Sequence, residues 1–288
     1  MNKYTTPTLS LLLCIALFSG CAGVGRQGGP GLDRAGNVTQ QAQQLFRQGK
    51  FELAARAYSR AIAAEPNNAT LYFNRAVCLN HLGETGQAIS DYSRVLELDP
   101  GFAPALANRG IALASTGEQD RAIEDLRKAY RSKPASAVIA FNLGLVYARQ
   151  GRYKKAVSRY SQALKHRSGF TRAYNNRGIA YLELGRHSRA ARDFTKAIKL
   201  DGGRADLYFN RGVAFEKSGQ LQRSISDYTR ALEIDSSCAP ALYNRGLLRI
   251  NLGKRRQGCS DLHRACELGL CGKLEETRIR KMCGRYNY

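Results

Sequence analysis

The sequence predicts an all-α fold made of seven helix-turn-helix units of 34 residues each, followed by a C-terminal capping helix. Three observations predict it: Asn recurs every 34 residues, Gly recurs at the same interval, and each interval contains two apolar stretches with helical spacing. The recurring residues are Asn74, Asn108, Asn142, Asn176, Asn210 and Asn244, and Gly49, Gly83, Gly117, Gly151, Gly185, Gly219 and Gly253.

This register covers residues 35–272 without an insertion. Each unit is expected to turn at its recurring Gly, because Gly accepts a positive φ without strain. A unit of this size cannot bury its apolar face alone, so stacking of neighbours must supply the core. The predicted units are 35–68, 69–102, 103–136, 137–170, 171–204, 205–238 and 239–272.

The units resemble the tetratricopeptide repeat. In 171–204 the small residue Gly178 and the large residues Tyr181 and Phe194 stand where the family has small and large residues. The Trp that the family carries at position 4 is missing throughout, and Tyr takes its place in three units. The resemblance implies a right-handed superhelical solenoid in which the first helix of each unit lines a concave groove that binds partners.

The resemblance also implies a role for the recurring Asn side chains, which should project into this groove. A carboxamide offers donors and an acceptor, so it can pair with the backbone of an extended peptide. Apolar neighbours would anchor the ligand. The alternative is that each Asn bonds the neighbouring helix. The predicted peptide contacts are Asn74, Asn108, Asn142, Asn176, Asn210, Asn244, Phe141, Phe209 and Tyr243.

Five units carry both an Arg at position 7 and an Asp at position 23, and the other two units lack both. The fourth unit has Leu143 and Arg159 there instead. Pairing between neighbouring units would place Arg159 near Arg177, which is repulsive. The pattern therefore predicts a structural salt bridge between the two helices of one unit. The pairs are Arg75–Asp91, Arg109–Asp125, Arg177–Asp193, Arg211–Asp227 and Arg245–Asp261.

Residues 1–20 have the pattern of a signal peptide. A short basic start precedes the apolar segment 9–18, which is too short to span a bilayer, since that needs ~20 residues. Small residues before Cys21 resemble a bacterial lipobox, which implies cleavage there and lipidation of Cys21; plain secretion is the alternative. Ala22 is not the Asp of an inner-membrane retention signal, so we expect an outer-membrane anchor facing the periplasm. Residues 21–34 are predicted to be a flexible, Gly-rich tether.

The formal net charge of +22 would ordinarily indicate nucleic acid as a partner. A periplasmic location argues against nucleic acid as the partner and favours an anionic glycan or lipopolysaccharide. The basic residues concentrate in 137–170 and 171–204. The alternative is a solvated face that aids solubility. The candidate residues of this basic belt are Arg152, Lys154, Lys155, Arg159, Arg186 and Arg189.

Four Cys residues cluster near the C-terminus, and an oxidising compartment makes disulfides the default for such a cluster. Cys259 and Cys266 share one helix face, and a capping helix within 273–288 can return antiparallel to it. This arrangement favours Cys259–Cys283 and Cys266–Cys271, although three pairings are possible. Zinc is the rival interpretation, but the spacings fit no familiar zinc pattern.

We find no catalytic, phosphate-binding or haem motif in the sequence. We therefore expect no enzyme activity, no cofactor and no metal. The main functional hypothesis is a lipid-anchored scaffold that binds envelope proteins of pilus, secretion or peptidoglycan machinery in its Asn-lined groove. The alternative is a binder of anionic glycan or lipopolysaccharide through the basic belt.

Overall fold

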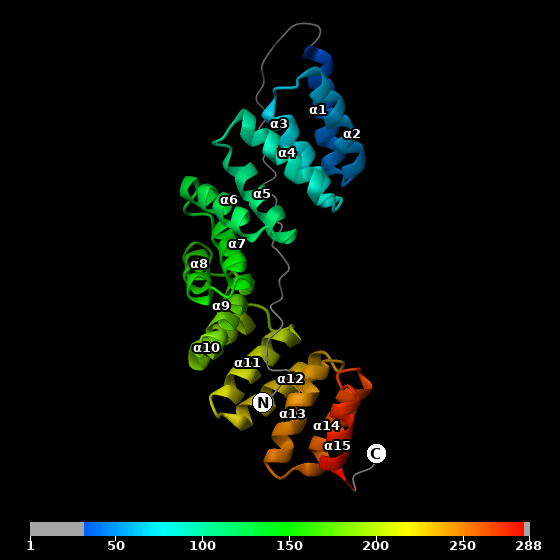
Figure 1. Ribbon diagram of the computed structural model, residues 1–288, viewed down its shortest axis with the longest axis vertical. Coiled ribbons are helices and arrows are strands. Elements are labelled where there is room, and N and C mark those ends of the chain that lie inside the picture. The colour runs from blue at the N-terminus through cyan, green and yellow to red at the C-terminus, as the bar shows by residue number, and fades with distance from the viewer. Residues whose placement is uncertain (1–31, 285–288) are drawn as a thin grey trace. The chain divides into compact units, whose positions relative to one another are not determined.

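The computed structural model describes residues 32–284, which fold into fifteen α-helices (Figure 1). Fourteen of them pair into seven helix-turn-helix repeats, and the last helix follows the seventh repeat. The predicted all-α fold of seven units and a C-terminal helix is confirmed. No helix between residues 32 and 284 is long and apolar enough to cross a membrane. The signal peptide, Cys21 and most of the predicted tether lie outside the described residues.

From the second repeat onward, each first helix begins at the first residue of its predicted unit. The first helices are α1 (Leu32–Arg47), α3 (Ala69–His81), α5 (Ala103–Ser115), α7 (Ala137–Arg149), α9 (Thr171–Glu183), α11 (Ala205–Lys217) and α13 (Ala239–Asn251). The second helices are α2 (Phe51–Ala64), α4 (Thr85–Leu98), α6 (Gln119–Ser132), α8 (Tyr153–His166), α10 (His187–Leu200), α12 (Leu221–Ile234) and α14 (Arg255–Glu267).

The two ends of the described chain differ slightly from the predicted boundaries. Helix α1 begins at Leu32, inside the segment 21–34 that the sequence assigned to the tether. The capping helix α15 spans Lys273–Cys283 and is therefore shorter than the predicted segment 273–288, whose last four residues lie outside the described range.

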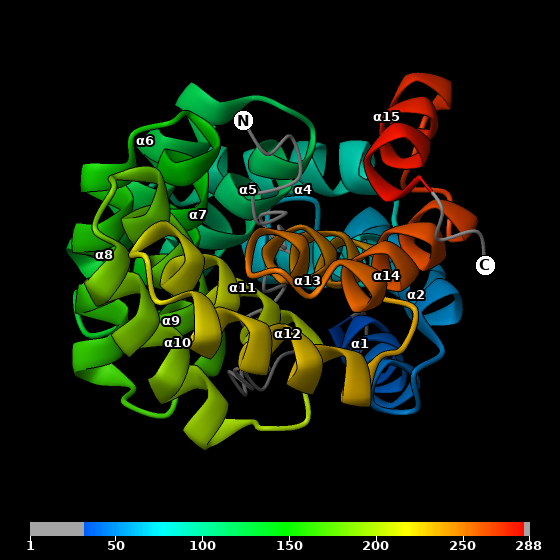
Figure 2. The same cartoon turned by 90° about the horizontal axis from the view of Figure 1, so that it is seen from below.

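The described chain forms two compact bodies, residues 32–151 and residues 152–284. The first contains α1 to α7 and the second contains α8 to α15, so the boundary falls inside the fourth repeat. Within each body, every helix packs on the next one along the chain. Figure 2 shows this for α11, α12 and α13. Sequence neighbours are thus spatial neighbours, as in other repeat proteins.

Glycine fixes both the turn and the helix spacing within a repeat. The recurring glycines of the turns all have a positive φ, between 68° and 92°. At position 8, a Cβ added to Gly178 would lie 2.6 Å from the ring of Phe194, and one added to Gly212 would lie 2.7 Å from the ring of Tyr228. In these two repeats a larger residue at position 8 would therefore displace the facing ring, whereas the first two repeats accommodate Ala42 and Ala76 at this position.

Candidate functional site

The predicted Arg–Asp pair is present in all five repeats that carry both residues. In the third repeat, Arg109 Nε and Nη2 donate to the two carboxylate oxygens of Asp125 at 2.7 and 2.9 Å. The side chains of the five Asp residues are 5–9% exposed and those of the five Arg residues are 13–25% exposed. The pairs confirmed are Arg75–Asp91, Arg109–Asp125, Arg177–Asp193, Arg211–Asp227 and Arg245–Asp261.

Each of these Arg residues also reaches the preceding repeat, which the sequence analysis did not anticipate. Arg109 Nη1 donates to Ser93 Oγ on α4 at 3.1 Å, so one guanidinium joins three helices. The hydrogen bond to Asp91 raises the pKa of Arg75 by more than burial lowers it, so the group stays charged. The contacts to the preceding repeat are Arg75–Ser59, Arg109–Ser93, Arg177–Ser161, Arg211–Thr195 and Arg245–Thr229.

We call this arrangement, in which one Arg binds an Asp in its own repeat and a Ser or Thr in the preceding repeat, the Arg–Asp joint. The fourth repeat lacks it. Leu143 occupies the Arg position and is buried. Arg159 occupies the Asp position and donates to Gln162 Oε1 at 2.9 Å. In the third repeat, Arg127 takes the place of the Ser or Thr that would accept the third contact. The pair is therefore lost in the fourth repeat, which contains the boundary between the two compact bodies, and the acceptor is lost in the repeat before it.

The six recurring Asn side chains lie in the core, where they are 0–7% exposed. Asn108 Nδ2 donates to the Tyr92 hydroxyl at 3.3 Å, and Asn244 Nδ2 donates to the Tyr228 hydroxyl at the same distance. Each of these two bonds joins a first helix to the second helix of the preceding repeat. These contacts match the alternative interpretation of the Asn residues, as bonds to a neighbouring helix.

The three predicted aromatic contacts are also buried: Phe141 is 0% exposed, Tyr243 5% and Phe209 9%. The ring of Phe209 packs on that of Tyr228 with their centroids 5.7 Å apart. The Tyr243 hydroxyl donates to Glu275 Oε1 on α15 at 2.6 Å. Tyr243 thus lies at the junction of the last repeat and the capping helix. Peptide contact through these rings and the six Asn residues stays a prediction.

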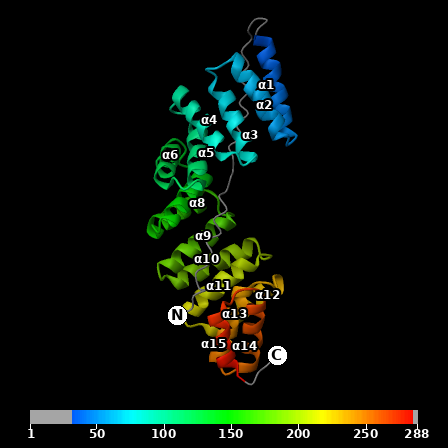
Figure 3. The same ribbon diagram turned by 45° about the vertical axis from the view of Figure 1, so that its right-hand side comes forward.

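Both favoured disulfides are present at the C-terminal end. Cys259–Cys283 joins α14 to α15 with its Cα atoms 5.7 Å apart, and Cys266–Cys271 closes the turn between them at 4.6 Å. Ile279 of α15 is 1% exposed against the last repeat. Figure 3 shows α13, α14 and α15 side by side. These sulfur atoms are bonded to one another, so they offer no thiolates to zinc.

The structure places the residues of the predicted basic belt in the C-terminal body, and anion binding by them stays a prediction. The belt residues Arg152, Lys154, Lys155 and Arg159 lie on α8 or directly before it, and Arg186 directly precedes α10. Of these six residues, Arg189 alone lines the pocket between α9, α10, α11 and the start of α12.

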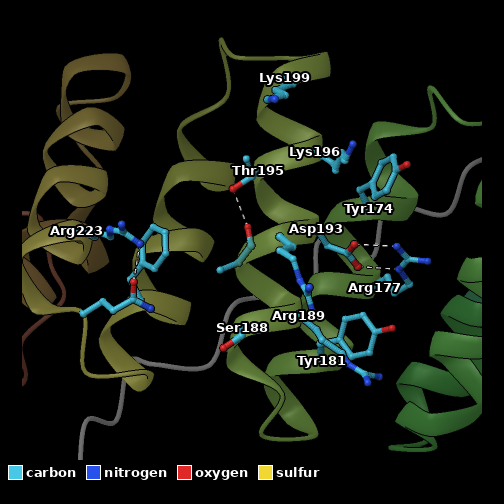
Figure 4. Close-up of a pocket in the computed structure, with 14 residues that line it drawn as sticks. Tyr174, Arg177, Tyr181, Ser188, Arg189, Asp193, Thr195, Lys196, Lys199 and Arg223 are labelled. Atoms are coloured by element: carbon cyan, nitrogen blue, oxygen red, sulfur yellow. Dashed lines mark hydrogen bonds and ion pairs between the residues drawn. The ribbon is translucent and has the colours of Figure 1, made fainter.

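A pocket of about 920 Å³ lies in the C-terminal body, where α9, α10, α11 and the start of α12 meet (Figure 4). Its only carboxylate is Asp193, and Arg177 engages it. The other basic side chains therefore have no carboxylate partner in the lining. The basic residues of this pocket are Arg177, Arg189, Arg192, Lys196, Lys199 and Arg223, and its aromatic residues are Tyr174, Tyr181 and Phe215. We call it the basic pocket.

Guanidinium groups lie over all three rings of the basic pocket. Arg177 Cζ is 5.6 Å from the ring centroid of Tyr174, Arg189 Cζ is 5.9 Å from that of Tyr181, and Arg223 Cζ is 5.8 Å from that of Phe215. Cation–π contacts of this kind orient a guanidinium without neutralising its charge. The pocket therefore offers preorganised positive charge to an anion.

Most residues of this pocket are not among those predicted from the sequence, which include Arg189 but not Arg192, Lys196, Lys199 or Arg223. One signal was available in the repeat alignment: Lys199 stands at position 29, where three other repeats have Glu.

The described residues define a class of protein, in which paired helices pack in sequence order and are coupled through shared polar contacts. A tetratricopeptide repeat family model matches residues 39–101, 82–137, 141–205 and 175–239, over half of the chain. The chain therefore belongs to the tetratricopeptide repeat family, whose members are protein–protein interaction scaffolds and are generally non-catalytic.

Known proteins agree with this assignment. Stress-induced-phosphoprotein 1 of Caenorhabditis elegans is 39% identical over 51 residues, a match that spans 18% of this chain and only 16% of that protein. The structure of MamA is 29% identical with a TM-score of 0.54, over 56% of this chain and 94% of MamA. Pseudomonas aeruginosa PilF, at 22% identity and a TM-score of 0.63 over 74% of this chain and 96% of its own, shows the same fold.

Replacing Asp227 with Asn should destabilise the protein, because it leaves a partly buried Arg211 without its carboxylate. We expect a loss of about 3 kcal/mol in the free energy of unfolding, measured by urea titration. The control is Glu233→Gln, which removes an ion pair to Arg230 whose two side chains are each 54% exposed, and which should change stability little. Equal losses in the two variants would contradict a structural role for the Arg–Asp joint.

Removing the disulfide between α14 and α15 should cost more stability than removing the one in the turn. Loop-closure entropy predicts about 3 kcal/mol for Cys259→Ser with Cys283→Ser, whose sequence separation is 24, and about 2 kcal/mol for Cys266→Ser with Cys271→Ser, separated by 5. Urea unfolding of both double variants measures the difference. A larger loss from the turn disulfide would count against this account.

Proposed function

We propose that this protein is a lipid-anchored scaffold that binds protein partners in the cell envelope. The observation that carries the proposal is its membership of the tetratricopeptide repeat family, which supports protein or peptide partners. Seven repeats offer many helix surfaces, so several segments of one partner, or several partners, can be held at once.

The envelope location rests on the sequence. The apolar segment 9–18, the small residues after it and Cys21 support lipidation and an outer-membrane anchor that faces the periplasm. The two disulfides of the C-terminal end suit an oxidising compartment of this kind. Assembly of pilus, secretion or peptidoglycan machinery is the kind of process that such a scaffold would serve.

Replacing Cys21 with Ser should release the protein from the membrane, because the thiol that carries the lipid is lost. We expect wild-type protein in the membrane fraction with a palmitate label, and the variant unlabelled and soluble after osmotic shock. Cys14→Ser lies within the apolar segment and serves as the control, which should stay in the membrane fraction. Membrane retention of the Cys21 variant would refute the anchor.

A crosslinked pull-down from the envelope fraction, at low and high salt, tests the scaffold. We expect a set of envelope proteins that survives high salt, because apolar contacts are screened far less than exposed charges. Mass spectrometry would identify these proteins and glycans together. Recovery of glycan or lipopolysaccharide alone, lost at high salt, would contradict the scaffold and favour the basic belt as the functional surface.

A further inference from the structure

The second helix of the fifth repeat alone among the seven carries basic residues at positions 22, 26 and 29 together. Elsewhere in the described chain, the basic residue at position 26 has an acidic partner on its own helix in four repeats. These pairs are Arg94–Glu97, Lys128–Glu124, Arg230–Glu233 and Arg264–Glu267. Helix α10 instead carries Lys196 at position 26 and Lys199 at position 29, with Arg192 one turn earlier, and none of the three has a carboxylate partner among the described residues.

This arrangement works against the stability of α10. Like charges three or four residues apart on a helix repel one another, whereas an Arg–Glu pair at the same spacing attracts. The repeat therefore tolerates a small loss of stability in order to keep these charges free. Positions that depart from a stabilising pattern without a structural gain are those where binding is expected.

A pocket at the equivalent place in the N-terminal body gives an internal comparison. It lies among α2, α3 and α4, has a volume of about 420 Å³, and includes Glu52, Glu84 and Asp91 with Arg56 and Arg75. Arg56 pairs with Glu52, and Arg75 pairs with Asp91. Its basic groups are thus neutralised. The free positive charge of the basic pocket is not a general property of the groove between repeats.

The spacing of the charges limits the shape of a ligand. Arg189, Arg192, Lys196 and Lys199 recur every three or four residues, so they lie on one face of α10, and Figure 4 shows Lys196 and Lys199 following Asp193 along this helix. At a rise of 1.5 Å per residue the four span ~15 Å. A single small anion could contact one or two of them. Several negative charges along an extended ligand are needed to engage the whole row.

The rings of the pocket favour polypeptide over glycan. Guanidinium groups already approach the rings on which a sugar could stack: Tyr181 has both Arg177 and Arg189 within 5.9 Å of its centroid. Phe215 is approached in the same way by Arg211 and Arg223, each at 5.8 Å. Oriented guanidinium groups suit bidentate hydrogen bonds to carboxylates.

We propose that the basic pocket binds an acidic segment of a partner protein, with several Asp or Glu side chains aligned along Arg189, Arg192, Lys196 and Lys199. The proposal rests on the proposed function, since it names the chemistry of a protein partner. It places this contact on the second helices of the repeats, away from the Asn residues that the sequence analysis selected.

The test uses the full mature chain and a fluorescent oligoglutamate peptide longer than ~15 Å when extended. Anisotropy at about 0.15 M salt, where the Debye length is about 8 Å, should show binding that an equivalent oligoglutamine peptide lacks. Lys199→Glu should weaken it about tenfold or more, because it reverses a charge in the row and neutralises Lys196. Lys165→Glu makes the same charge change at position 29 of the fourth repeat, on an exposed side chain outside the pocket, and should change affinity less than about twofold.

A thermal melt separates lost binding from lost folding. Lys199→Glu should raise the melting temperature by about 1 °C, since it replaces a repulsion on α10 by an attraction. Lower stability together with weaker binding would overturn the proposal, as would equal effects of the two variants. Binding of polygalacturonate without binding of oligoglutamate would assign the pocket to glycan instead. If the protein captures envelope proteins that survive high salt but does not bind the peptide, the proposal for this pocket is wrong and the proposed scaffold function is still supported.

Discussion

The guanidinium at position 7 of the repeat is the contact on which the regular stack depends. In Arg109 it holds Asp125 on the second helix of its own repeat and Ser93 on the second helix of the repeat before. One side chain thus fixes the pairing within a repeat and the register between repeats. Because the carboxylates are nearly buried, the geometry has little freedom. Hydrophobic burial supplies the driving force, and this joint makes one arrangement of the helices preferable to a slipped one.

The same residue type performs two different tasks on this molecule, and its partners tell them apart. Arg177 lines the basic pocket, yet its charge is committed to Asp193 and to Ser161. Arg192 and Lys196 lie one turn apart on α10 and have no such partners among the described residues. The net charge of +22 therefore does not show where positive charge is available to a ligand. It counts paired side chains such as Arg177 and unpaired ones such as Lys196 alike.

Sequence periodicity predicted the helices well because each one repeats the same local pattern. The salt bridge could be identified because Arg and Asp are both missing in the same two repeats. Which side chains are buried was harder to predict. Period 34 places Asn108 on a helix face, but whether that face meets solvent depends on the Tyr92 hydroxyl of another repeat. Likewise, the place of Tyr243 depends on α15, and the basic pocket forms only where four helices converge. Such features come from packing between elements, which no single element encodes.

The two ends of the described chain are not equally secured. The last repeat is closed by α15 and two disulfides, whereas the first repeat has Gln41 and Ala57 where others have the Arg–Asp joint. In a linear array, each repeat is supported only by its neighbours. Under mechanical tension the first repeat should therefore open before the last one. A cargo held near the C-terminal end would stay bound under a load that had already unravelled the opposite end.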